Sequence, residues 1–451
     1  MNRGMVIGAA AAVALAGAVA FVKADNYAGV GAGYMAKVTC SEIFLASRDA
    51  IAVIDGEFGD ISPALARVNL KIDTVNRSVE ADIFGLGRAA AFYRDGYGCT
   101  LKRGALMALP ELAPVTDTPL PEALPGTPLL RDDVDYDAIG AALDAAFADE
   151  KAATRSVLVL KDGAIVAERY ADGFSAATPF LSWSMAKSVT ATMVGVAVLQ
   201  GFIDLETPAP VAEWGSGDKR AAITWNDLLQ MQSGLAFSEV YDDPASDASQ
   251  MLFRARDAGL VAAKKAAIHA PGSYWSYSSG TTNLLQRTLR ATLEANDAGY
   301  HAFARDHLFA PLGIASAVLE PDASGAFIGS SFMYATARDW AKLGQLYLND
   351  GVVNDKRLLP EGWSAYVAAP ASASDGFYGA QFWLNHPGKD GRPKYMPGVP
   401  DDAYLMAGHE GQYVLIVPDK RLVIVRTGLT RGVEPMPLVA PMFAAIYAAV
   451  Q

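Results

Sequence analysis

The chain has 451 residues, a formal net charge of −12 and a pI near 5.0. A hydrophobic share of 51% with only 19% charged residues predicts a globular chain with a well-buried core, not a disordered one. The length leaves room for one large domain with an appendage, or for two domains. Nucleic acid is excluded as a partner, because phosphate binding needs clustered Lys and Arg and the sequence has no basic run.

The first residues carry a targeting signal. Arg3 precedes an uncharged, mostly apolar run from Met5 to Val22, which Lys23 ends. Small residues around Ala24 provide a cleavage point, as in a secretory signal peptide, and the run is also just long enough to span a bilayer. We therefore expect residues 1–24 to be a signal peptide or a membrane anchor. The protein would be exported to the periplasm, either free or associated with the inner membrane through residues 5–22.

Two cysteines, Cys40 and Cys99, follow this leader. In an exported protein such a pair predicts a disulfide rather than a metal site. The five histidines are scattered, at positions 269, 301, 307, 386 and 409, and none belongs to a Cys/His cluster with zinc-ligand spacing. The sequence therefore implies no metal and no cofactor.

A proline-rich segment divides the chain. Residues 109–128, LPELAPVTDTPLPEALPGTP, contain prolines that disfavour long helices and central strands. We place the domain boundary there, with a linker at 109–135, an N-terminal segment of unassigned fold at 25–108 and a larger domain at 136–451. Helical spacing of apolar residues from Tyr136 to Phe147 opens the larger domain.

The larger domain has a predicted hairpin near each end. Residues 156–167 form two apolar runs around Asp162-Gly163, a strong tight-turn pair. Residues 413–425 form two more around a turn at 418–421. Strands at both ends with helices between them predict one sheet built from the two termini of the domain. The predicted helices lie at 189–199, 282–294 and 336–349.

The segment Ser184-Met185-Ala186-Lys187 opens a long apolar helix. The spacing puts the hydroxyl and the amine on one helix face, with about 5–6 Å between Cβ atoms. A serine hydroxyl is a poor nucleophile until a base removes its proton, and a lysine out of water can supply that base. Ser216-Gly217-Asp218-Lys219 has the same spacing but lies among turn residues, which predict a loop. Ser184 is therefore the candidate nucleophile.

Two later segments contain candidate partners for this pair. Tyr277 lies in an aromatic and serine-rich loop, residues 271–280, where a tyrosine beside a lysine cation can shuttle protons; an ordinary buried tyrosine is the alternative. Gly411 precedes the last hairpin, where a glycine lets backbone N–H groups approach a substrate carbonyl. His409 in the same segment could instead be a general base or have a purely structural role. Lys389-Asp390-Gly391 competes as a lysine-x-glycine element, although no strand follows it.

In this order, three segments resemble the motifs of the serine β-lactamase and penicillin-binding-protein superfamily: Ser184-Met185-Ala186-Lys187, Tyr277-Ser278-Ser279 and His409-Glu410-Gly411. The similarity is closer to the class C β-lactamase branch, with its esterases and 6-aminohexanoate-dimer hydrolases. Residues 223–235, 308–314 and 335–344 are similar to further shared segments, so the resemblance covers roughly residues 150–430. It implies an α+β, β-lactamase/transpeptidase-like fold. An antiparallel sheet would be flanked by helices, with an all-helical lobe and, here, an N-terminal appendage.

The resemblance also implies an acyl-enzyme mechanism. Ser184 would attack a carbonyl carbon, and Lys187 with Tyr277 would move its proton to the leaving group and later take one from water. The backbone N–H groups of Ser184 and Gln412 would form the oxyanion hole.

The sequence departs from the family pattern where the substrate binds. Ser279 replaces the family's asparagine, whose amide contacts a β-lactam side chain. His409, followed by Glu410 and Gly411, replaces the lysine that binds a penicillin carboxylate, and a histidine is only partly protonated near neutral pH. We therefore expect Ser279, His409 and Gly411 to contact a carboxylic ester or a small linear amide. The alternatives are a penicillin-binding-type D,D-peptidase or β-lactamase, and a non-catalytic binding protein of the same fold.

Overall fold

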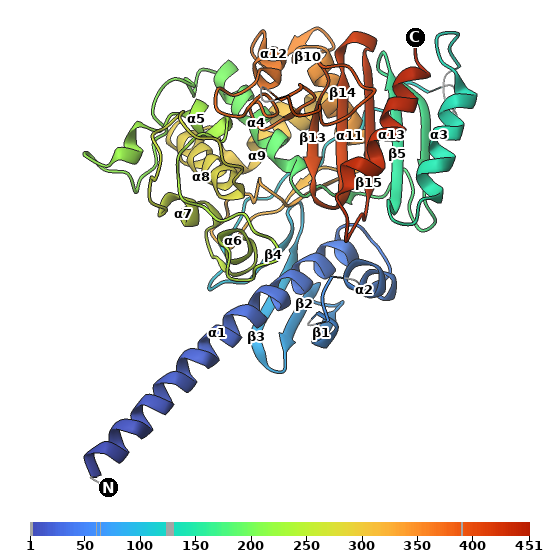
Figure 1. Cartoon of the computed structure of the whole chain (residues 1–451). Helices are drawn as coiled ribbons and strands as arrows, with labels where there is room; N and C mark the ends of the chain where they lie inside the picture. Colours follow the sequence, from blue (N-terminus) through green and yellow to red (C-terminus); the bar gives the residue numbers. More distant parts are fainter. Residues whose placement is uncertain (1–2, 60, 64, 123–129, 389–390) are drawn as a thin grey trace. The chain divides into compact units, whose positions relative to one another are not determined.

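The computed structural model describes residues 3–59, 61–63, 65–122, 130–388 and 391–451 (Figure 1). The chain divides into two compact units. Unit 1 contains residues 1–94, 98–106 and 238–256, and unit 2 contains residues 95–97, 107–237 and 257–451.

Unit 1 contains the helices α1 (Arg3–Phe44), α2 (Ala50–Phe58) and α6 (Asp247–Arg254), the 3-10 turn η1 (Leu65–Arg67), and the strands β1 (Val68–Asp73), β2 (Ser78–Ile83), β3 (Leu86–Arg94) and β4 (Gly98–Leu101). The strands form one antiparallel sheet in the order β1-β2-β3-β4. Cys40 in α1 is joined to Cys99 in β4, with 6.0 Å between the Cα atoms, so the predicted disulfide is present in the structure.

The helix α6 belongs to unit 1, although its residues come from the middle of the sequence. The ring of Phe253 in α6 lies 5.4 Å from the ring of Tyr34 in α1, edge to face. A Cβ on Gly33 would lie 2.6 Å from the Phe253 carbonyl oxygen, so α1 and α6 approach closely at this glycine. The sequence-based boundary at 109–135 did not anticipate that residues 238–256 complete the N-terminal unit.

The predicted leader and the residues after it form one helix: α1 begins at Arg3, passes Ala24 without a break and ends at Phe44. Several apolar side chains of its described part are exposed to solvent: Val19, Phe21, Val22 and Tyr27. Within the part of the chain that the structure describes, no helix has both the length and the apolar character needed to cross a membrane. Cleavage or retention of the leader stays a prediction.

Unit 2 has ten helices among its described residues: α3 (Tyr136–Ala148), α4 (Met185–Leu199), α5 (Trp225–Leu229), α7 (Ala258–Ala263), α8 (Ser279–Ala295), α9 (Tyr300–Ala304), α10 (Ala310–Leu312), α11 (Ala337–Leu348), α12 (Trp363–Ala368) and α13 (Pro435–Ala448). Its strands are β5 (Thr154–Lys161), β6 (Ala164–Tyr170), β7 (Phe180–Leu181), β8 (Val318–Leu319), β9 (Met333–Ala335), β10 (Val352–Val353), β11 (Lys356–Arg357), β12 (Trp383–Leu384), β13 (Tyr404–Gly408), β14 (Gln412–Val417) and β15 (Leu422–Gly428). Short 3-10 turns are η2 (Lys219–Ala222), η4 (His409–Gly411) and η5 (Pro418–Lys420), and η3 (Arg305–Phe309) is a π-helical turn.

The main sheet of unit 2 joins the two ends of the larger domain. Its six antiparallel strands have the order β12-β13-β14-β15-β5-β6, and β15 pairs with β5 along most of its length. The predicted single sheet and both predicted hairpins are therefore confirmed. At the first hairpin Asp162 and Gly163 both have positive φ, 51° and 80°, as a tight turn between twisted strands requires.

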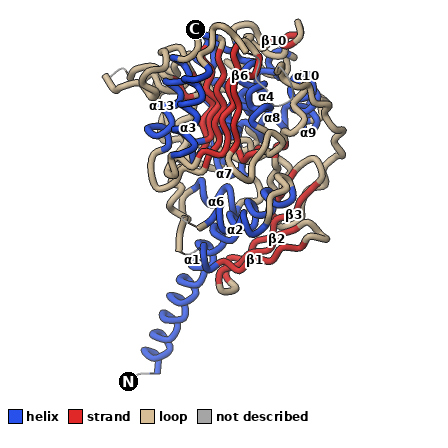
Figure 2. Tube along the Cα trace, turned by 90° about the vertical axis from the view of Figure 1, so that its right-hand side faces the viewer, coloured by secondary structure: helices blue, strands red, loops and turns tan. Residues whose placement is uncertain are grey.

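Helices cover both faces of this sheet, as predicted. Successive strand residues point to opposite faces of the sheet, so each face contributes to a separate core. The helices α3 and α13 pack on one face, and α4 packs on the other (Figure 2). The helix α11 belongs to the same core as α4. Along β5, for example, Leu158 and Leu160 join the core with α4, whereas Val157 and Val159 join the core with α3. The predicted helices appear as α3, α4, α8 and α11.

The proline-rich segment belongs to unit 2 and lies against its core. Residues 107–122 form neither helix nor strand, as the prolines predict, and residues 123–129 lie outside the described part. Apolar side chains of the segment pack on the core that contains α4: Leu109, Leu112, Val115 and Leu120. Hydrophobic contact therefore holds this segment on unit 2.

Candidate active site

Ser184 stands at the start of α4 with its hydroxyl available. A serine at this position usually caps the helix by accepting a backbone N–H, but the Ser184 side chain makes no such bond. Its Oγ instead accepts a hydrogen bond from Lys187 Nζ at 3.0 Å. Ser184 is half-buried, while every other residue from Ser182 to Ala197 is buried. Ser184 is thus the partly exposed residue at the start of a buried run.

Lys187 is 1% exposed and is held by three neutral acceptors. Its ammonium donates to Ser184 Oγ, to Ser279 Oγ at 2.9 Å and to the Ser330 carbonyl oxygen at 3.0 Å. These bonds fix the lysine beside the serine and keep it away from water, and the amine can act as a base once it has given up one of its protons.

Tyr277 lies against the same lysine. Lys187 Nζ is 4.8 Å from the centroid of the Tyr277 ring, within the range of a cation–π contact. The start of α8 places the ring: Ser278 caps this helix by accepting the Thr281 N–H at 3.0 Å, so Tyr277 directly precedes the first turn. The structure thus brings the three predicted catalytic residues together.

Ser279 has a different position from the one expected of a substrate contact. It is fully buried, and its hydroxyl accepts a hydrogen bond from Lys187. In this conformation it helps to orient the lysine, and its contact with a substrate stays a prediction.

Sequence reasoning missed Ser330 and Asn283, which hold Lys187 through its third hydrogen bond. Ser330 accepts the lysine's third hydrogen bond through its carbonyl oxygen, and Asn283 in α8 fixes Ser330 twice. The Asn283 amide accepts the Ser330 N–H at 3.1 Å and donates to Ser330 Oγ at 3.0 Å. Local sequence did not single out Asn283, because α8 has other buried polar residues close to it, including Ser279, Thr282 and Gln286.

Trp183, the residue before the serine, has a strained backbone. Its φ of 45° is in the left-handed region, which bulky residues avoid at a cost of about 1–3 kcal/mol. Such strain persists only where surrounding contacts enforce it, and it concentrates at functional sites. The indole is 9% exposed and lies edge to face on the His409 ring, with 5.7 Å between centroids.

The hairpin between β13 and β14 meets the serine segment at Gly408. A Cβ on Gly408 would lie 2.2 Å from the Ser182 carbonyl oxygen, so only glycine fits there. Gln412 is the first residue of β14, an inner strand between β13 and β15, and pairs with Gly408 across the hairpin. Its side-chain amide is bound to Gly428 in both directions. These side-chain bonds fix the first residue of β14 beside the turn, and the role of the Gln412 backbone N–H as an oxyanion donor stays a prediction.

The second oxyanion donor would be Ser184 itself. Among the described residues, its backbone N–H has no hydrogen-bond partner, whereas the N–H groups of the next residues close the first turn of α4. An open N–H at the start of a helix can stabilise developing negative charge.

His409 is exposed, in contrast to the residues that follow it. Gly411 is buried and has a φ of 86°; its carbonyl oxygen accepts a hydrogen bond from Arg426 Nη1 at 2.6 Å. Arg426 is fully buried, and this burial lowers the pKa of its guanidinium to about 10. Gly411 is therefore fixed in the turn by Arg426, and its contact with a substrate stays a prediction.

Aromatic rings extend outward from Tyr277. Its ring centroid lies 5.5 Å from that of Trp383 and 5.9 Å from that of Tyr378. Trp383 in turn stacks on Phe377 and Tyr395, at 6.2 and 6.0 Å. Apart from buried Tyr378 these rings are half-buried, so an apolar group of a substrate held at Tyr277 would meet aromatic surface.

The competing serine–lysine pair does not resemble a site. Ser216 and Lys219 are exposed, and Ser216 lies in a turn. The competing Lys389-Asp390-Gly391 element has its first two residues outside the described part. In the described residues no group of three or more His, Cys, Asp or Glu side chains could hold a metal ion.

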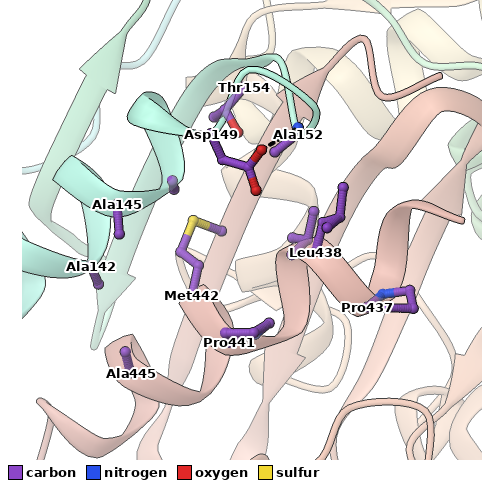
Figure 3. Close-up of a pocket in the computed structure, with 12 residues that line it drawn as sticks. Ala142, Ala145, Asp149, Ala152, Thr154, Pro437, Leu438, Pro441, Met442 and Ala445 are labelled. Carbon is purple, nitrogen blue, oxygen red and sulfur yellow. Dashed lines mark hydrogen bonds between the residues drawn. The ribbon is translucent and has the colours of Figure 1, made fainter. Parts of the chain in front are cut away.

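A hollow of about 370 Å³ lies elsewhere, between α3 and α13 (Figure 3). Its lining is mostly alanine, proline and other apolar side chains, with Asp149 and Thr154 at one side. It lies on the face of the sheet opposite α4 and includes none of the predicted site residues.

Comparisons with known proteins agree with this arrangement. The family model described as Beta-lactamase matches residues 137–450. The chain is 27% identical over 260 residues to the 6-aminohexanoate-dimer hydrolase of Paenarthrobacter ureafaciens, a match that covers 52% of this chain and 65% of that protein. The chain therefore spans less than two thirds of the length of this relative.

Two solved structures have a similar fold. A putative 6-aminohexanoate-dimer hydrolase from Bacillus anthracis superposes with a TM-score of 0.58 and 22% identity, over 75% of this chain and 90% of that one. A family VIII carboxylesterase superposes with a TM-score of 0.53 and 16% identity, over 70% of this chain and 97% of that one. The predicted fold and family resemblance are confirmed: the chain belongs to the beta-lactamase family.

Proposed function

We propose that the protein cleaves a carboxylic ester or a small linear amide through an acyl-enzyme intermediate. The observation that carries this proposal is the hydrogen bond of 3.0 Å from buried Lys187 to the half-exposed hydroxyl of Ser184. The family and the named relatives support amide or ester hydrolysis as the reaction class.

The geometry suggests how each step would proceed. Ser184 Oγ would attack the carbonyl carbon as its proton passes to the Lys187 and Tyr277 pair, and the resulting oxyanion would accept hydrogen bonds from the backbone N–H groups of Ser184 and Gln412. The pair would then protonate the leaving alcohol or amine. Water would attack the acyl-enzyme and give its proton to the same pair, which would return a proton to Ser184 Oγ as the acid leaves.

The surroundings favour a substrate that is uncharged near the scissile bond. The rings of Tyr277, Trp383 and Phe377 offer apolar contact. The carboxylate of Glu410 accepts hydrogen bonds from Trp183 and Arg431. Arg431 is therefore already paired, and the turn has no lysine that could bind the carboxylate of a β-lactam. This is the physical reason to favour esters and linear amides over penicillins.

A fluorophosphonate probe and a p-nitrophenyl ester test the proposal together. Ser184 Oγ should displace fluoride from phosphorus, and mass spectrometry of the labelled peptide should place the adduct on Ser184, with ester turnover lost in proportion to labelling. A labelled penicillin that forms a stable adduct would point instead to a D,D-peptidase. Neither labelling nor turnover would favour a non-catalytic binding protein.

We also propose that the protein is exported, because Arg3 to Ala24 have the pattern of a leader and the Cys40–Cys99 disulfide suits an oxidising compartment. Periplasmic and membrane fractions should contain the protein with both cysteines protected from alkylation. N-terminal sequencing then separates the two outcomes: a start near residue 25 indicates cleavage, and an intact α1 in the membrane fraction indicates an anchor. Cytoplasmic protein with two free thiols would contradict export.

A further inference from the structure

We propose that Trp183, Glu410 and Arg431 form a clamp that fixes the serine segment to the β13–β14 hairpin and thereby positions the oxyanion donors. The three are positioning residues, since they would act through Ser184 and through the hairpin that carries Gln412, the two predicted oxyanion donors. The inference rests on the proposed function, because it concerns the rate of the same reaction.

The first part of the clamp is the indole of Trp183. Its Nε1 donates a hydrogen bond of 3.2 Å to Glu410 Oε2, which joins two segments more than 200 residues apart in the sequence. Trp183 directly precedes Ser184 and keeps a left-handed backbone despite its bulk. A residue in that conformation needs contacts that hold it, and the bond to Glu410 with the His409 ring contact supplies them.

The second part is a carboxylate that is turned inward at the hairpin tip. Glu410 is 5% exposed and has a φ of 60°. A charged group in a three-residue turn would ordinarily point to water, since burying a charge is unfavourable unless it is paired and hydrogen-bonded. Both oxygens of this carboxylate are engaged: Oε2 by Trp183, and Oε1 by a hydrogen bond and ion pair from Arg431 Nε.

The backbone of the same turn is tied to the segment that carries Arg431. The Thr430 N–H donates to the Glu410 carbonyl oxygen at 3.0 Å. The turn is therefore held by its backbone as well as by its side chain, so its position relative to Trp183 is defined by several bonds of different kinds.

The clamp has an electrostatic role as well as a geometric one. Glu410 lies two residues from Gly408, whose close contact with Ser182 brings the hairpin to the serine segment. An unneutralised carboxylate in that hairpin would oppose the negative charge that develops on the substrate oxygen. Arg431 offsets that charge, so the ion pair should matter most in the transition state.

The test compares Trp183→Phe, Glu410→Gln and their double variant in the full-length protein, with turnover of a p-nitrophenyl ester normalised to sites titrated by fluorophosphonate. Each single variant should lower kcat about 10- to 100-fold with less than about a threefold change in KM, because a displaced donor weakens transition-state binding. The double variant should lose less than the product of the two single losses, because the bond between Trp183 and Glu410 couples the two positions. Arg431→Gln should lower kcat at least as much as Glu410→Gln, and Arg431→Lys should restore part of the loss.

Arg169→Gln is the matched control, because it breaks an exposed ion pair of 2.6 Å with Asp144 and should leave kcat unchanged. Variants with wild-type kcat per titrated site, or with losses that multiply in the double variant, would overturn the clamp. A lower melting temperature with unchanged kcat would show a purely structural role and would overturn it too. Absence of turnover in the wild type would refute the proposed function itself, which is a separate result.

Discussion

Replacing Ser184 with alanine should lower the rate of ester hydrolysis by about 10⁴-fold or more while the protein stays folded. The hydroxyl is the one group of α4's first turn that is half-exposed and bonded to the buried lysine. Alanine favours the helix and removes only this oxygen, so the packing of α4 should persist. Steady-state kinetics with a p-nitrophenyl ester, together with a melting curve, measure both effects.

The chain provides its own control for that substitution. Ser216 has the same spacing to a lysine, Lys219, but lies exposed in a turn. Ser216→Ala should keep wild-type turnover. Equal rates for the wild type and Ser184→Ala would remove Ser184 from the mechanism, and a loss in Ser216→Ala alone would move the site to the loop.

Replacing Lys187 with methionine should lower kcat by about 10²- to 10⁴-fold, the range for loss of a positioned acid–base group. Methionine has a similar length and suits both a helix and a 1% exposed site. Ser279 and Ser330 would each lose a donor, at about 1–3 kcal/mol for each buried group left unpaired. Removal of the buried ammonium offsets part of that loss, so the melting temperature should fall moderately and the activity severely.

Lys219→Met is the corresponding control, since the Lys219 side chain is exposed in the second serine–lysine segment. It should leave both kcat and the melting temperature unchanged. A Lys187→Met protein that is folded and retains kcat within about threefold of the wild type would show that another group activates the serine.

The sequence was sufficient to predict the two hairpins of the main sheet of unit 2 and the serine–lysine pair. Asp162-Gly163 identified one hairpin through local turn chemistry, and the apolar runs at 413–425 identified the other. Ser184 and Lys187 were identifiable because helical spacing fixes which side chains are neighbours, and the buried run after them separated this pair from Ser216 and Lys219. These features depend on residues close together in the chain.

The remainder depended on contacts that local sequence does not encode. Gly408 and Gly411 both lie at the turn, and the sequence does not show which of them meets the serine segment. The structure shows that it is Gly408, because the Ser182 carbonyl oxygen leaves no space for a Cβ there. The resemblance, not local sequence, assigned Gln412 as an oxyanion donor and placed Ser279 at the substrate. That Ser279 accepts a hydrogen bond from Lys187 could not be predicted from local sequence. The amphipathic pattern of α6 predicts burial but not the helix it packs on.

The origin of α6 has a consequence for how the protein is made. During synthesis the N-terminal helix emerges long before residues 247–254 exist, so the face at Gly33 and Tyr34 must wait for Phe253. The Cys40–Cys99 link can close earlier, because both cysteines belong to the first hundred residues. Unit 1 therefore cannot be completed before residues 107–237 of unit 2 have been synthesised. The first unit matures only once more than half of the polypeptide has been produced, and until then its uncovered apolar surface is a target for chaperones.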